Sequence, residues 1–115
     1  MKLPEYFTDK EICCPCCGLH PCTRSVHRLY QVRLAIGVVK VNSGRRCIRH
    51  NDEVGGVMAS SHLSGRAFDV HVPNATYRYK LVEAAIASGF TRIIIHDTFV
   101  HIDDLTETFN LSNSK

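Results

Sequence analysis

The sequence predicts a single α+β domain in which a small central antiparallel sheet has helices packed on one side. Residues 23–36 and 76–88 repeat apolar side chains at intervals of three and four, the periodicity of amphipathic helices. Between and after them lie short β-branched runs, and two of these runs are separated only by Asp97-Thr98, which predicts a tight hairpin. A chain of 115 residues makes one domain with a modest core, so residues 1–115 are predicted to form one unit.

The first predicted helix is short and lies near the N-terminus. Thr8 and Glu11 have the spacing of a capping box, and Pro15 stops the helical turn that follows. The helix over residues 23–36 is expected to end at Gly37. The remaining elements are predicted, in order, as a strand over 38–42, a loop over 45–56, a strand over 67–72, a helix over 76–88 ended by Gly89, strands over 92–96 and 99–103, and a polar tail that frays from Thr106.

The composition is that of a soluble globular protein, with 44% apolar and 22% charged residues and a formal net charge of +3. The basic residues are scattered, so no nucleic-acid-binding stripe is predicted. No run of residues is long and apolar enough to span a membrane, and Met1–Tyr6 lacks the apolar stretch of a signal peptide. We therefore expect a monomer that is made in the cytoplasm and does not insert into a membrane.

Six cysteines form a second notable feature. Five fall between residues 13 and 22, and the sixth is separate: Cys13, Cys14, Cys16, Cys17, Cys22 and Cys47. The pairs 13/16 and 14/17 have Cys-x-x-Cys spacing. Three alternatives stay open: free, partly buried thiols in a reducing cytoplasm, disulfides outside the cell, or a structural zinc bound by some of the first four with Cys22, Cys47 or His20.

The candidate metal ligands lie around residues 60–69. His62 and Asp69, separated by small residues, are both good ligands for a divalent metal such as zinc. The best third ligand is His101. Two His and one Asp, with a fourth position open to water, form the arrangement of a catalytic zinc rather than a structural one. His71 shares a strand face with Asp69 and is an alternative ligand.

The predicted hairpin also decides where His96 points. With a two-residue turn, His96 lies opposite Phe99, and Ile94 lies opposite His101. His96, His101 and Asp103 then project from one face of the sheet. A continuous strand would instead place His96 and His101 on opposite faces, so the hairpin is what allows His96 to approach the metal.

Four separated segments carry a family resemblance. They are Ser43-Gly44-Arg45-Arg46, Asn51-x-x-Val54-Gly55-Gly56, Ser60-x-His62-x-x-Gly65-x-Ala67-x-Asp69 and Val100-His101-Ile102-Asp103. Their order over roughly residues 5–105 resembles the zinc-dependent D-alanyl-D-alanine peptidases of the M15 class. The resemblance implies the fold shared by these peptidases and hedgehog domains, with one catalytic zinc held by His62, Asp69 and His101 in a cleft on the open face of the sheet.

The resemblance leaves the general base as the main open question. The vancomycin-resistance and carboxypeptidase branches place Glu or Asp three residues before the last His ligand, where this chain has Thr98. Other branches place a His five residues before it, which matches His96. We predict His96 as the proton carrier or oxyanion stabiliser, with Asp97 and Asp103 as rival bases. Asp103 could equally orient a His ligand.

The resemblance also implies a substrate. Arg46 matches the Arg of the family's Ser-Gly-x-Arg segment, and its guanidinium suits a free terminal carboxylate. Ser60 is predicted to hydrogen-bond substrate or backbone. Gly65 and Ala67 are predicted to allow close packing of the backbones that carry His62 and Asp69.

The predicted function is a zinc peptidase that cuts bonds involving D-amino acids in peptidoglycan stem peptides. It would act as a D-Ala-D-Ala carboxypeptidase or as an endolysin-type endopeptidase. Because no signal peptide is predicted, a phage or prophage product is expected, reaching the cell wall after lysis or within a virion. The alternative is a catalytically inactive zinc-containing binding or virion structural module of the same fold, which the absence of an acid at Thr98 favours.

Overall fold

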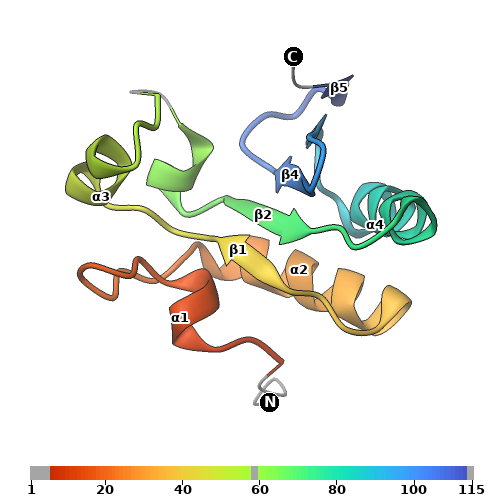
Figure 1. Cartoon of the computed structure of the whole chain (residues 1–115), viewed down its shortest axis with the longest axis horizontal. Helices are drawn as coiled ribbons and strands as arrows, with labels where there is room; N and C mark the ends of the chain where they lie inside the picture. Colours follow the sequence, from red (N-terminus) through yellow and green to blue (C-terminus); the bar gives the residue numbers. More distant parts are fainter. Residues whose placement is uncertain (1–5, 58–59, 114–115) are drawn as a thin grey trace.

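The computed structural model describes residues 6–57 and 60–113. Residues 1–5, which carry most of the segment from which the absence of a signal peptide is predicted, lie outside this range. The fold is α+β, as predicted, and centres on a five-stranded sheet of order β1-β2-β4-β3-β5 (Figure 1). The strands are Val41–Ser43 (β1), Ala67–His71 (β2), Arg92–Ile95 (β3), Phe99–Asp103 (β4) and Asn110–Asn113 (β5). Neighbouring strands are antiparallel except β3 and β5, which are parallel.

The helices differ greatly in length. They are Asp9–Ile12 (α1), Thr23–Ile36 (α2), Ile48–Glu53 (α3) and Ala75–Ser88 (α4), with a 3-10 turn at Ser61–Ser64 (η1). The longest, α2 and α4, have 14 residues each. No helix among residues 6–57 and 60–113 has the length and apolarity needed to cross a membrane.

The core lies between one face of the sheet and the two long helices. Strand residues alternate between faces, and one alternate set, Phe68, Val70, Ile93, Val100 and Ile102, packs in the same buried cluster as Leu29 and Val32 of α2 and Leu81 and Ala85 of α4. The other set, which includes Asp69 and His101, faces away from these helices. The helices therefore leave the second face of the sheet for the functional site.

Several predicted boundaries are confirmed because local signals set them. Thr8 and Glu11 form the predicted capping box, in which the Thr8 side chain accepts from the Glu11 backbone N–H. Helix α2 has the predicted bounds. Helix α4 starts one residue before the predicted Thr76, because Asn74 is its N-cap, and Gly89 follows it in the left-handed conformation, with φ of +103°.

Three sequence-based expectations are wrong. The predicted loop over 45–56 contains α3, and the predicted fraying tail contains β5. The predicted strand over 38–42 is shifted, because β1 starts only at Val41. Val39 and Val41 are both buried in the core, but the chain pairs with β2 only from Val41 onward. The β-branched residues therefore marked a buried segment that is longer than the strand.

The missed elements have weak sequence signals for physical reasons. Of the six residues of α3, only Asn51 is buried, so no apolar periodicity marks the helix. Strand β5 is exposed along its whole length and pairs through its backbone with β3. An edge strand of this kind needs no alternating apolar pattern.

Candidate metal centre

His62, Asp69 and His101 come together on the face of the sheet opposite the long helices. Each offers one ligand atom, and these atoms all lie within 4.8 Å of one another. All three residues are buried. The structure thus places the three predicted ligands in one group. The alternative ligand, His71, is half-buried and is not a member of it.

Sheet register and a short turn bring these residues together. Asp69 on β2 is paired directly with His101 on β4, so both side chains project from the same face. His62 lies in η1, where the Ser60 hydroxyl accepts a 3.2 Å hydrogen bond from the His62 backbone N–H. Gly65 ends this turn with φ of +74°, a conformation that favours glycine. Ser60 therefore helps to position the His62 backbone, and this role does not depend on any contact with a substrate.

A backbone carbonyl fixes the orientation of the His62 ring. The Nδ1–H group of His62 donates to the carbonyl oxygen of Gly44 at 2.7 Å. This bond occupies Nδ1 and leaves Nε2 facing the candidate ligand group, 3.3 Å from Oδ1 of Asp69. Metal-ligating histidines usually donate their other ring N–H in this way, so the contact suits a ligand that binds through Nε2.

A buried carboxylate, that of Asp103, contacts the ring nitrogen of His101 that points away from the candidate ligand group. Its Nε2 lies 2.7 Å from Oδ2 of Asp103 and 3.2 Å from the hydroxyl of Ser61. Its Nδ1 lies 2.9 Å from Oδ1 of Asp69, so Nδ1 is the nitrogen that faces the ligand group. Asp103 is fully buried and also lies 3.0 Å from Nε of Arg92. These contacts are those expected of an orienting group, the second of the two roles predicted for Asp103.

The charges of the group favour a bound cation. Burial raises the pKa of Asp69, but hydrogen bonds from His101 and His62 outweigh it and hold this pKa below its usual range. Burial lowers the pKa of His101, but the hydrogen bonds to Asp103 and Asp69 raise it overall. A positive charge is therefore stabilised between the two carboxylates. Two imidazole nitrogens and a carboxylate oxygen are also a donor set that zinc accepts.

An open cavity of about 320 Å³ lies over this group. Arg46, Ser60 and His96 line it together with the three candidate ligands. Asp97 is exposed and Asp103 is buried behind His101, and neither is among the lining residues. The structure thus brings three of the predicted non-ligand residues to the cavity and leaves two carboxylates outside it.

The hairpin that places His96 has the predicted register. Ile94 is paired with His101 across β3 and β4, and the His96 backbone N–H donates to the carbonyl of Phe99 at 3.0 Å. The His96 ring stacks on the Phe99 ring with centroids 4.1 Å apart and planes inclined by 10°. Stacking holds the imidazole at the cavity wall, outside the group of candidate ligands.

Arg46 is held at the edge of the group by two polar neighbours. Its Nε lies 3.3 Å from the Ser43 hydroxyl, and its Nη1 lies 3.3 Å from Oδ1 of Asn51. The remaining nitrogen, Nη2, lies 3.8 Å from Oδ2 of Asp69. Asn51 is buried and also donates to the carbonyl of Val57, so it fixes both Arg46 and the cavity rim.

Two supporting residues were not predicted from the sequence. Ser61 contacts both His101 and Asp103, yet it falls at the unspecified position between Ser60 and His62 in the matched segment. Asn51 belongs to a recognised segment, but only the fold shows that it contacts Arg46. The segment match is the only sequence signal that could have singled it out.

Gly44 supports the site through a close backbone contact. A Cβ atom at this position would lie 2.4 Å from the carbonyl oxygen of Ile12 and 2.7 Å from its Cα atom. The added methyl group would force the Ile12 backbone to shift, because backbone atoms cannot rotate away as a side chain can. We therefore expect Gly44→Ala to lower the free energy of unfolding by roughly 1–3 kcal/mol. Urea unfolding of the two proteins measures this loss. An unchanged midpoint would show that the contact relaxes without cost.

Asp103 gives a prediction about metal affinity. Asp103→Asn keeps the shape but weakens the bond that orients His101, so zinc affinity should fall by about 10–100-fold. Competition with a chromophoric chelator measures this change. The matched control is Asp97→Asn, which removes an exposed carboxylate outside the cavity and should leave affinity unchanged. Equal affinities in both variants would remove the orienting role.

Comparison with known sequences identifies the family of this chain. The model of the family described as Peptidase M15 matches residues 5–103, a span that includes all three candidate ligands, Arg46 and His96. No curated protein matches the chain. Because the match covers most of the 115 residues, the chain belongs to the peptidase M15 family of zinc-dependent metallopeptidases.

Proposed function

We propose that this protein is a zinc peptidase that hydrolyses bonds involving D-amino acids in peptidoglycan stem peptides. One observation supports this most strongly: His62, Asp69 and His101 form a candidate metal group beneath an open cavity that Arg46 and His96 also line. The cavity therefore combines a metal site with a candidate carboxylate-binding group and a candidate proton carrier. These are the groups that hydrolysis of a peptide next to a free carboxylate requires.

The proposed zinc ligands are Nε2 of His62, a carboxylate oxygen of Asp69 and Nδ1 of His101. This choice follows from the hydrogen bonds that occupy the other ring nitrogen of each histidine. A zinc ion bound there would polarise the scissile carbonyl and lower the pKa of a bound water toward about 7.

His96 is the proposed proton carrier or oxyanion stabiliser. It lines the cavity, and its ring is held against Phe99. The rivals are less well placed, because Asp97 is exposed outside the cavity and Asp103 is engaged by His101, Ser61 and Arg92. An imidazole at this position could accept a proton or donate a hydrogen bond to a developing negative charge.

Arg46 is proposed to bind the substrate carboxylate. Its Nε and Nη1 are held by Ser43 and Asn51, so the guanidinium is fixed with Nη2 toward the candidate metal group. A planar, permanently charged group of this kind suits the terminal carboxylate of a stem peptide. Ser60, at the cavity wall, is proposed as a further substrate contact.

Arg46→Ala should therefore raise KM or lower kcat/KM on substrates with a free C-terminus, with zinc content unchanged. The expected loss is about 10–100-fold, because a hydrogen bond to a charged group contributes about 1.5–3 kcal/mol. Assays on matched free and amidated peptides measure it. Arg45→Ala is the control, since the Arg45 side chain contacts the His20 carbonyl instead. Equal activity on both peptides, with or without Arg46, would contradict this role.

The proposed activity has two forms that products distinguish. A carboxypeptidase would release free D-Ala from the end of a stem peptide, whereas an endopeptidase would create new amino termini within it.

Digestion of purified peptidoglycan tests the proposal. Zinc-loaded protein should release fragments identified by mass spectrometry, and the His62→Ala variant should not. The alternative is a zinc-containing binding or virion structural module, which the Thr98 position favours. Binding to peptidoglycan without any cleavage by the zinc-loaded protein would support that alternative and overturn the proposed activity.

A further inference from the structure

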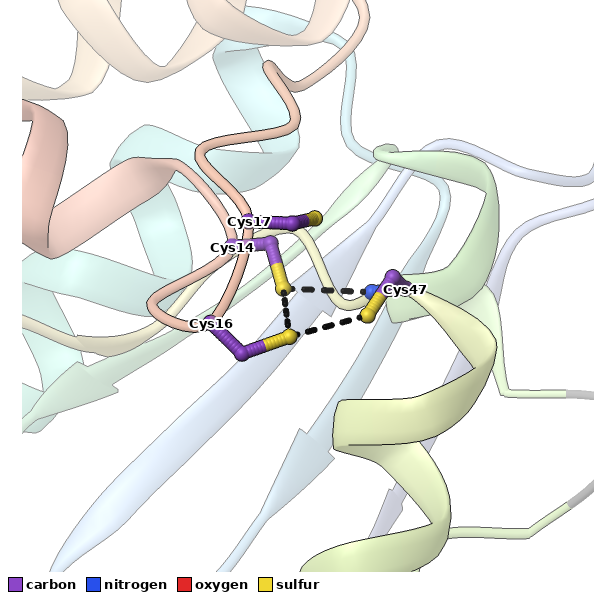
Figure 2. A group of neighbouring side chains, drawn as sticks. All are labelled: Cys14, Cys16, Cys17 and Cys47. Atoms are coloured by element: carbon purple, nitrogen blue, oxygen red, sulfur yellow. Dashed lines mark hydrogen bonds between the residues drawn. The ribbon is translucent and has the colours of Figure 1, made fainter.

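A second group of candidate metal ligands lies away from the cavity and consists only of cysteines. One sulfur from each of Cys14, Cys16, Cys17 and Cys47 lies within 4.8 Å of the other three. Figure 2 shows that three come from the loop after α1 and the fourth from the start of α3. All four are free thiols. Residues 31 positions apart in the sequence thus meet at one point, where the Sγ atoms of Cys16 and Cys47 are 3.1 Å apart.

We propose that these four cysteines, which we call the cysteine site, bind a structural zinc ion. Four thiolates without an open position for water form the closed tetrahedral arrangement of structural zinc sites. The cysteine site is separate from the proposed catalytic centre, because it shares no residue with His62, Asp69 and His101. Its role would therefore be to stabilise the fold and not to act on substrate.

The sulfur distances suit a zinc ion. Zinc–sulfur bonds of about 2.3 Å place the sulfurs of a tetrahedral site about 3.8 Å apart. The Cys14 and Cys16 sulfurs are 3.6 Å apart, the Cys16 and Cys47 sulfurs are 3.1 Å apart, and no pair exceeds 4.8 Å. Small side-chain rotations at the exposed residues Cys16 and Cys17 would bring all four sulfur atoms to zinc-bonding distance.

The backbone of the loop is folded to present these sulfurs. The Cys14 N–H donates to the Leu19 carbonyl at 2.9 Å, and the Gly18 N–H donates to the Cys14 carbonyl at 2.8 Å. Gly18 has φ of +75°, which lets the chain turn back sharply. The resulting tight turn gathers Cys14, Cys16 and Cys17 within one short loop.

Backbone N–H groups also point at two of the sulfurs. The Cys47 N–H donates to the Cys14 sulfur at 3.4 Å, and the His50 N–H donates to the Cys47 sulfur at 3.4 Å. Such donors stabilise negative charge on sulfur, the form that binds zinc. If all four sulfurs were ionised they would repel one another, and a bound divalent ion would offset that repulsion.

Two alternatives to a zinc ion at the cysteine site account for fewer of these observations. One is a disulfide, and the other is a metal ion bound by a neighbouring group of residues. A disulfide between Cys16 and Cys47 would use only two of the four sulfurs and leave Cys14 and Cys17 unexplained. A third group of candidate ligands, Asp9, Cys13 and His20, also has ligand atoms within 4.8 Å of one another. It offers only three ligands, however, and the Cys13 sulfur is already paired with Nδ1 of His20 at 3.2 Å.

Zinc at the cysteine site would stabilise the conformation of the segment that carries Arg46. Cys47 directly follows Arg46, whose backbone N–H donates to the His62 carbonyl at 3.0 Å. Arg45 donates through its backbone to the Ile12 carbonyl at 2.8 Å. The ion would thus connect the N-terminal loop to the backbone that positions both Arg46 and His62.

Metal analysis of the reduced full-length protein tests this inference. Wild type should hold two zinc ions per chain, and His62→Ala should hold one. The double variant Cys16→Ser/Cys47→Ser should also hold one, with isosteric side chains at positions that are exposed and half-buried. Cys22→Ser is the matched control, because Cys22 lies outside the cysteine site, and it should keep both ions.

Cobalt substitution gives a readout that needs no cysteine variant. Cobalt-loaded His62→Ala should show the charge-transfer absorption of thiolate-bound cobalt, and the cysteine double variant should lack it. Absence of this band in reduced His62→Ala would overturn the inference, as would equal zinc content in wild type and the double variant. A metal-free wild type whose intact mass is lower by two hydrogens would also contradict it, by showing a disulfide instead. None of these outcomes depends on peptidase activity.

Discussion

His101→Ala should remove one zinc ion per chain and reduce peptide hydrolysis to background. His101 is one of the three candidate ligands that the described residues bring together here, and its Nδ1 lies 2.9 Å from Oδ1 of Asp69. Two remaining ligands would hold zinc weakly, because catalytic zinc sites ordinarily use three protein ligands. Elemental analysis of the purified variant measures the loss, and hydrolysis of stem peptides measures its consequence.

Two further variants separate loss of metal from loss of folding. His101→Ala also leaves the buried Asp103 without its imidazole partner, which costs stability. His62→Ala removes a ligand whose other contact is a backbone carbonyl, so it tests the same site with less disturbance. His71→Ala is the matched control, since His71 lies on β2 outside the ligand group. If both ligand variants are folded and keep all of their zinc, the assignment of His62 and His101 as zinc ligands is wrong.

His96→Ala should keep its zinc and lose activity. A positioned acid–base group contributes about 10²–10⁴-fold to rate, so kcat should fall by that factor. The variant also loses the stacked contact with Phe99, which is 4.1 Å between centroids. His96→Phe restores an aromatic ring without a titratable nitrogen, so the two variants should be equally impaired if the imidazole handles the proton. Steady-state kinetics and zinc analysis on the same samples measure both quantities.

The rival carboxylates are tested beside His96. Asp97→Asn should have near-normal kcat, because Asp97 is exposed and is not among the residues that line the cavity. Asp103→Asn should lose zinc affinity, and its kcat should recover when zinc is saturating. If His96→Ala retains normal kcat while zinc-saturated Asp97→Asn or Asp103→Asn is inactive, the base is that carboxylate and the assignment to His96 is wrong.

Local sequence signals were sufficient for much of the fold and for the geometry around His96. The turn at Asp97-Thr98 has only two residues, so its length alone set the register that pairs Ile94 with His101. Helices α2 and α4 were recognisable because each packs an apolar stripe on the sheet. The matching segments selected His62, Asp69 and His101, which the fold brings within 4.8 Å.

Features that depend on contacts between distant segments were not predictable in the same way. Ser61 approaches His101 across 40 positions of sequence, and Cys47 meets Cys16 across 31. Neither contact has a local pattern, so the sequence left free thiols, disulfides and a structural zinc open as alternatives. Strand β5 was missed for a related reason, since it pairs through its backbone and all of its side chains are exposed.

Diffraction data collected at the zinc absorption edge from crystals of zinc-loaded protein would show whether zinc binds at His62, Asp69 and His101. We expect an anomalous peak at about 2.0–2.2 Å from Nε2 of His62, a carboxylate oxygen of Asp69 and Nδ1 of His101. Zinc found only at the cysteine site, with the contacts of His62 and His101 to Asp69 unchanged, would contradict a catalytic zinc in this protein.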